Sequence, residues 1–162
     1  MARAKNWDGT QLCSLARTLE AVGDRWTFLI LREATAGTTR FSGFRDALGI
    51  SSDILAARLT TLVDGGIMCR ESYKEPGRRP HDEYVLTESG RGLDLVLAAL
   101  QQWGDKHVPS PVPTITYRDR RSRPLRVTFV DQDGHLVDSP DVQAQRPAPG
   151  EDAGQVEPGT AA

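Results

Sequence analysis

A pair of glycines, Gly65-Gly66, separates two kinds of pattern in this chain. Before the pair, apolar residues recur at the spacing of amphipathic helices, and after it come two short β-favouring segments, 67–73 and 82–86. Glycine stops a helix readily because it adopts a left-handed conformation at the helix end without steric cost. The chain is therefore expected to fold as a group of helices followed by a β-hairpin.

Helical periodicity predicts three helices before the one that ends at the glycine pair. The first runs from Leu12 to Val22, the second is capped by Asp24, and a short third is capped by Ser42. The helix that ends at the pair spans residues 52–64, with Ser51 or Ser52 as its cap. Its apolar stripe consists of Leu55, Leu59 and Leu62.

A long helix is predicted after the second strand, with Thr87 as its cap and Trp103 near its end. Its apolar residues, Leu95 among them, cover more of its surface than one small core requires. The surplus predicts that a second surface of this helix is buried.

The order helix, helix, turn, helix, hairpin, helix predicts a mainly α fold with a small β-hairpin wing, an α+β winged helix-turn-helix. Two uses of such a domain remain open on pattern alone: binding of DNA, and a winged-helix protein-interaction module that no longer binds DNA. In the first, the helix 52–64 is the recognition helix that enters the major groove.

The loop between the two strands, residues 74–81, carries Lys74, Arg78 and Arg79 in a chain whose net charge is −2. Exposed arginines serve in many proteins only to solvate a loop. Beside a helix-turn-helix they have a further use, because neutralising phosphates supplies much of the affinity for DNA. The outer face of helix 52–64 offers few cations, so this wing is expected to grip the DNA backbone or the minor groove.

Small residues on the outer face of the recognition helix suit contacts with thymine methyl groups and phosphates, through Ala, Thr and Ser side chains. Asp53 is interpreted as a favourable charge at the positive end of the helix. The complete set of predicted DNA contacts is Arg40, Ser42, Ser51, Ser52, Ala56, Ala57, Arg58, Thr60, Lys74, Arg78 and Arg79.

Several separated blocks of the sequence resemble, in the right order, the HxlR family of bacterial winged-helix regulators. They are LEAVGDRWTFLILREATAG, RFSGFRDALGISSDILAARLTTLVDGGI, RPHDEYVLTESG and the closing QQWG, within residues 13–104. The resemblance implies a homodimeric transcription factor, with repression as the expected mode, that binds a pseudo-palindromic double-stranded operator. It also implies a dimer built from the N- and C-terminal helices, through Trp7, Leu12, Leu15, Leu19, Leu93, Leu97, Leu100 and Trp103.

Some members of the family sense oxidants through a cysteine at the start of the first helix, where Cys13 stands. A helix N-terminus lowers the pKa of a thiol and favours the reactive thiolate. A free cysteine beside an apolar stripe is also commonly a small buried hydrophobe, so both interpretations stay open. A small-molecule effector between the dimer helices is a further candidate, although Trp26, Phe28 and Trp103 serve equally well as core residues.

Enzymatic chemistry is not expected. The three histidines are scattered, and no nucleophile, carboxylate pair or phosphate-binding glycine loop appears at a suggestive spacing. Two distant cysteines are too few for a zinc site, so no metal and no cofactor are predicted. No apolar run reaches the roughly 18 residues of a membrane span, and the N-terminus lacks a secretory signal, which predicts a cytoplasmic protein.

Four parts are predicted along the chain: an N-terminal arm (1–11), the DNA-binding and dimerisation domain (12–108), a C-terminal β-hairpin extension (109–138) and a tail (139–162). The extension includes five Arg and one Asp within residues 114–126, and its turn is expected at Asp133-Gly134. The tail is rich in proline, glycine and acids and is expected not to fold.

Overall fold

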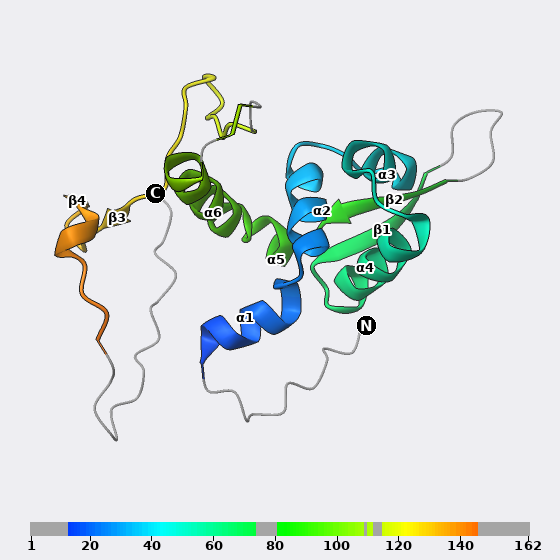
Figure 1. Cartoon of the computed structure of the whole chain (residues 1–162), viewed down its shortest axis with the longest axis horizontal. Helices are drawn as coiled ribbons and strands as arrows, with labels where there is room; N and C mark the ends of the chain where they lie inside the picture. The colour runs from blue at the N-terminus through cyan, green and yellow to red at the C-terminus, as the bar shows by residue number, and fades with distance from the viewer. Residues whose placement is uncertain (1–12, 74–80, 109, 112–114, 146–162) are drawn as a thin grey trace. The chain divides into compact units, whose positions relative to one another are not determined.

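The computed structural model of the chain describes residues 13–73, 81–108, 110–111 and 115–145. The chain divides into two compact units, residues 1–127 and 128–162, and each is described by itself. The elements of the first unit are, in order, α1 (Ser14–Val22), α2 (Arg25–Thr35), α3 (Phe41–Leu48), α4 (Ser52–Asp64), β1 (Met68–Tyr73), β2 (His81–Leu86), α5 (Glu88–Arg91) and α6 (Asp94–His107). Figure 1 shows them as a mainly helical unit with one antiparallel hairpin, which confirms the predicted class.

The core of the first unit lies where α2 meets its neighbours, since α2 contacts α3, α4, β2 and α6 (Figure 1). The stripe of Leu55, Leu59 and Leu62 on α4 is fully buried, as its helical spacing predicts. Ile30 and Leu31 of α2 and other residues from neighbouring elements complete the core. None of the helices in the described residues is both long and apolar enough to span a membrane.

The start of α2 follows the sequence prediction. The Asp24 carboxylate accepts hydrogen bonds from the backbone amides of Trp26, at 3.0 Å, and Thr27, at 3.3 Å. These amides have no partner inside the helix, so the cap stabilises the helix by about 1 kcal/mol.

The start of α3 differs from the prediction. Arg40, not Ser42, is the N-cap residue, and Ser42 lies in the first turn of the helix. The reason is tertiary: the Tyr84 amide of β2 donates to the Thr39 carbonyl at 2.8 Å, and Arg40 forms a β-bridge with Glu83. This pairing holds residues 39–40 extended, so the helix begins directly after them.

The long helix predicted from Thr87 to Trp103 is interrupted. Thr87 does cap its start, accepting from the Gly90 amide at 3.1 Å, but α5 ends at Arg91 and α6 begins at Asp94. A tightened turn, in which the Leu93 amide donates to the Gly90 carbonyl, separates the two helices. Glycine costs about 1 kcal/mol within a helix, and Gly90 is required here because a Cβ would lie 2.2 Å from the Ile67 carbonyl oxygen.

The second unit contains β3 (Phe129–Val130), β4 (Leu136–Val137) and the 3-10 turn η1 (Ser139–Asp141). The hairpin is shorter than its apolar alternation predicts, because Leu125 and Val127 belong to the first unit instead. Its turn lies where expected, with Gly134 at φ 84°. The predicted tail contains η1 at its start, and residues 146–162 lie outside the described part of the chain.

Candidate DNA interface

The turn between α3 and α4 gives the two helices a helix-turn-helix arrangement. Gly49 ends α3 in the left-handed conformation, at φ 60°, which glycine adopts without strain. Ile50 is buried beneath the turn. The Ser51 hydroxyl then accepts from the Ile54 amide at 3.5 Å, so Ser51 is the cap of α4.

The outer face of α4 is exposed along its whole length. Its inner stripe fills the core, and the residues on the opposite side of the helix are exposed to solvent among the described residues. The exposed residues on this side are Ser52, Asp53, Ile54, Ala56, Ala57, Thr60 and Thr61. All but one are polar or small, which suits close approach to the floor of a DNA groove.

Ile54 is the residue on this face that the sequence interpretation missed. It is 41% exposed in the first turn of α4, next to the cap. An exposed isoleucine there offers an apolar contact to a thymine methyl group. The sequence could have indicated this exposure, because Ile54 lies outside the buried stripe of Leu55, Leu59 and Leu62.

Arg58 is the one cation among the predicted contacts on α4, and the structure gives it a partner. Its Nε lies 3.0 Å from the Oδ1 of Asp24, the cap of α2. The contact is an ion pair without hydrogen-bond geometry, since this Nε has no hydrogen-bond partner among the described residues. Arg58 therefore connects α4 to the start of α2 and has less freedom to reach a phosphate.

The base of the wing is well defined, and its tip is not described. β1 and β2 pair in register from Met68–Leu86 to Tyr73–His81, so the strands end where the basic loop begins. Arg70 and Asp82 form an ion pair across the hairpin. The predicted contacts Lys74, Arg78 and Arg79 lie outside the described residues.

A groove of about 500 Å³ runs between the start of α3 and the base of the wing. Arg40 and Ser42, both predicted contacts, line it together with His81, which was not among them. No side chain among the described residues caps α3, which leaves its first amides available to an anion. Arg40 also pairs with Glu83, at 3.4 Å between Nε and Oε1, which offsets part of its charge.

Cys13 is exposed at the N-cap position of α1. The backbone amides of Ala16 and then Leu15 lower the pKa of its thiol, and the Arg17 charge lowers it slightly further. The sulfur makes no capping hydrogen bond of ordinary geometry, so the effect is that of oriented amide dipoles. Cys69 is half-buried, with its sulfur 3.7 Å from the Val85 carbonyl oxygen.

The predicted dimer residues fall into three groups. Leu15, Leu19, Leu100 and Trp103 are exposed, the last two at 52% and 61%. Leu97, at 7%, and the half-buried Leu93 instead pack into the core of the single chain. Trp7 and Leu12 lie outside the described residues.

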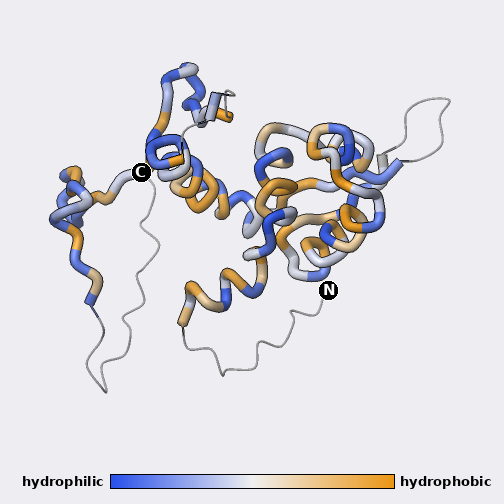
Figure 2. The backbone as a smooth tube through the Cα atoms, in the orientation of Figure 1, coloured by the Kyte–Doolittle hydropathy of each residue, from blue (hydrophilic) through white to orange (hydrophobic). Residues whose placement is uncertain are grey.

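Two further apolar residues of α6, Leu95 and Val96, are exposed beside Leu100 and Trp103. Figure 2 shows hydrophobic stretches along both α1 and α6. We call Val96, Leu100 and Trp103 the apolar face of α6. A monomeric protein rarely leaves a patch of this kind in water.

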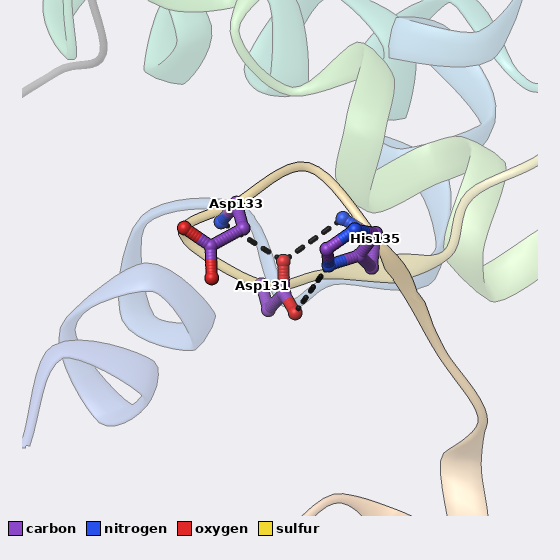
Figure 3. A group of neighbouring side chains, drawn as sticks. All are labelled: Asp131, Asp133 and His135. Atoms are coloured by element: carbon purple, nitrogen blue, oxygen red, sulfur yellow. Dashed lines mark hydrogen bonds and ion pairs between the residues drawn. The ribbon is translucent and has the colours of Figure 1, made fainter.

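Asp131, Asp133 and His135 gather in the turn of the second unit (Figure 3). Asp131 organises this turn, because its Oδ1 accepts from the His135 amide at 2.8 Å and from the Asp133 amide at 2.9 Å. These hydrogen bonds, that from His135 foremost, lower the pKa of the Asp131 carboxyl group. The three side chains are exposed, and the arrangement is explained by the turn alone.

The helix-turn-helix, its exposed second helix and the adjoining hairpin define a winged helix-turn-helix domain. The chain belongs to the HxlR-like helix-turn-helix family, whose model matches residues 21–111. The family resemblance inferred from the sequence is thereby confirmed.

Relatives of known sequence carry names of the same kind. The uncharacterised HTH-type transcriptional regulator Rv3095 of Mycobacterium tuberculosis is 46% identical over 98 residues, covering 60% of this chain. The chain spans 61% of that relative's length. The HTH-type transcriptional regulator YtfH of Escherichia coli is 35% identical over 111 residues, which cover 68% of this chain and 84% of YtfH.

Solved structures share the fold. The candidate transcription factor PA1607 superimposes with a TM-score of 0.73 at 36% identity, over 85% of this chain and 97% of its own. The redox regulator HypR, in its reduced form, gives a TM-score of 0.53 at 30% identity, over 59% of this chain and 96% of its own. The superposition on PA1607 covers 85% of this chain, whereas the family model covers about 56% of it.

Proposed function

We propose that two copies of this chain bind a pseudo-palindromic DNA operator and regulate transcription, by repression, in the bacterial cytoplasm. Residues 12–108 carry both the DNA-binding and the dimerisation surfaces. α4 enters the major groove, and the wing, residues 74–81, contacts the backbone or minor groove. In a two-fold dimer the two recognition helices lie about 34 Å apart, one turn of DNA.

The observation that carries this proposal is the division of α4 into two faces. One face is fully buried, and the other consists mostly of small residues that are exposed in the part of the chain that the structure describes. Because the buried face fixes α4 in the core, the orientation of its outer face relative to the rest of the first unit is also fixed. The open groove at the start of α3 adds a place for a phosphate beside it.

A binding titration tests the proposal. Fluorescence anisotropy is measured with the purified chain and the intergenic DNA next to its own gene, at about 50 mM and about 200 mM salt. Three phosphates neutralised by each wing give a log-log salt slope of about −5, so affinity falls about 10³-fold between these conditions. An affinity that does not change with salt contradicts the proposal and favours the protein-interaction module. That alternative is supported by the described surface of α4, which has no unpaired cation.

Oxidant sensing through Cys13 is proposed as the mode of regulation, and the exposed position of the thiol and its lowered pKa support it. HypR, one of the structural relatives, is named a redox regulator. The depressed pKa means that the folded chain favours the thiolate, which is the nucleophile. The corresponding stability is present above the ordinary thiol pKa and is lost as the pH falls through the lowered value.

Alkylation by iodoacetamide at neutral pH is therefore expected to modify Cys13 several-fold faster than a free cysteine, and Cys69 more slowly. The Cys13 rate is expected to reach half its plateau below the ordinary thiol pKa. Mass spectrometry of the peptides measures both sites in one sample, and Cys13→Ser isolates Cys69. Equal rates at the two sites remove the basis for a sensor. DNA affinity unchanged by diamide in the wild type rules out the sensor itself.

A further inference from the structure

The segment of residues 115–127 packs along α6 and is fixed to it by side-chain amides. Gln102 makes two hydrogen bonds to Val127: its Nε2 donates to the carbonyl at 2.9 Å, and its Oε1 accepts from the amide at 3.0 Å. Gln101 donates to the Ile115 carbonyl. A side-chain amide that both donates to and accepts from the backbone of one residue fixes the segment as a neighbouring strand would.

Between this segment and α6 lies a groove of about 420 Å³. A cavity of about 260 Å³ adjoins it on the side of α2, and both are lined by Gln101 and Tyr117. The larger groove has an apolar part, formed by Leu125 and Val127, and a polar part. Its size and mixed lining are those of sites that hold small organic molecules.

The polar part of the groove is cationic. Lys106 and Arg126 both line it, and neither forms an ion pair with another described residue. Asp105 also lines the groove and carries the opposite charge, but it has an interaction of its own. Arg126 belongs to a segment with five Arg and one Asp between residues 114 and 126, so the local potential is positive.

Tyr117 carries a hydroxyl group that is unpaired among the described residues. Its hydroxyl oxygen is buried and has no hydrogen-bond partner among the described residues. Burial, with the Asp94 charge adding to it, raises the pKa of this phenol, so it keeps its proton at neutral pH. An unpaired buried hydroxyl costs about 1 to 3 kcal/mol, and a ligand oxygen that accepts from it recovers that cost.

The groove stays accessible when the apolar face of α6 is covered. Ala98, Gln102 and Asp105 line the groove, and at 3.6 residues per turn they lie on the side of the helix opposite Val96, Leu100 and Trp103. A second copy that covers the apolar face therefore does not need to fill the groove.

We propose that this groove binds a small aromatic carboxylate. The carboxylate lies between Lys106 and Arg126, the ring packs on Leu125 and Val127, and the Tyr117 hydroxyl reaches the ligand from the adjoining cavity once small side-chain movements open it. No part of the helix-turn-helix takes part, so the proposal does not depend on DNA binding.

The test is isothermal titration calorimetry of the full chain with 2-naphthoate, and with neutral 2-naphthamide as the matched ligand. Saturable binding of one naphthoate per chain is expected, with naphthamide at least about ten-fold weaker because it lacks the charge-assisted contacts. Arg126→Ala and Lys106→Ala are each expected to weaken naphthoate by about ten-fold or more. Arg120→Ala, which removes an exposed arginine of the same segment outside the groove, is expected to leave affinity unchanged.

Tyr117→Phe separates binding from folding. Because the hydroxyl has no partner, its removal is expected to leave the melting temperature unchanged or raised, while naphthoate affinity falls several-fold. The proposal is overturned by the absence of saturable binding at millimolar naphthoate, by equal affinity for naphthamide, or by equal losses in Arg126→Ala and Arg120→Ala. None of these outcomes bears on whether the chain binds DNA.

Discussion

Replacement of both Arg78 and Arg79 by alanine is expected to reduce operator affinity by roughly 10³-fold at about 0.15 M salt. The double change removes four of six wing contacts in a dimer, and each contributes a salt exponent of about 0.9. The log-log salt slope is expected to fall from about −5 to about −2. Anisotropy titrations across a series of salt concentrations measure both quantities.

The chain offers a matched control for this experiment. Arg120→Ala combined with Arg121→Ala removes the same charge from exposed residues of the segment bound to α6. That variant is expected to keep the wild-type slope. If both double variants lose affinity equally, the effect comes from total charge and the role proposed for the wing is wrong.

Glutamate at both Leu100 and Trp103 is expected to convert the proposed dimer into a monomer. These side chains are 52% and 61% exposed on the apolar face of α6, and two-fold symmetry places four of them in the interface. At a minimum of about 1.5 kcal/mol for each, their loss weakens association by about 6 kcal/mol, or about 10⁴-fold. Repulsion between the introduced carboxylates adds to this loss.

Light scattering coupled to size-exclusion chromatography measures the mass directly, and DNA affinity is expected to fall with it. Thr60→Glu combined with Thr61→Glu adds the same charge at exposed positions of α4 and is expected to leave the mass unchanged. Circular dichroism checks that the double variant remains folded, since both replaced side chains lie outside the core. A wild-type chain that is already monomeric would refute the dimer.

Local signals in the sequence were sufficient to place α4 and its faces. The helix spans Ser52–Asp64, as predicted from the serine cap and the glycine pair, and its leucine stripe is buried. Each signal acts within a few residues of the helix end that it sets, where backbone and side-chain preferences decide the outcome. The same holds for the Asp24 cap of α2.

Features that depend on distant contacts were not predictable in this way. The start of α3 depends on pairing between Arg40 and Glu83, which are 43 positions apart. The ion pair between Arg58 and Asp24 exists only because α2 and α4 pack together. Leu97 and Leu100 share an apolar pattern, and only the packed structure shows that the first is core and the second is exposed.

The carboxylate of Asp24 serves two helices at once. It caps the amino end of α2 through two amides, and its Oδ1 lies 3.0 Å from the Nε of Arg58 on α4. A tilt of α2 is therefore expected to move α4 with it and, in the proposed complex, to change the angle at which α4 meets the DNA. A single acidic side chain thus couples the orientation of α4 to that of α2.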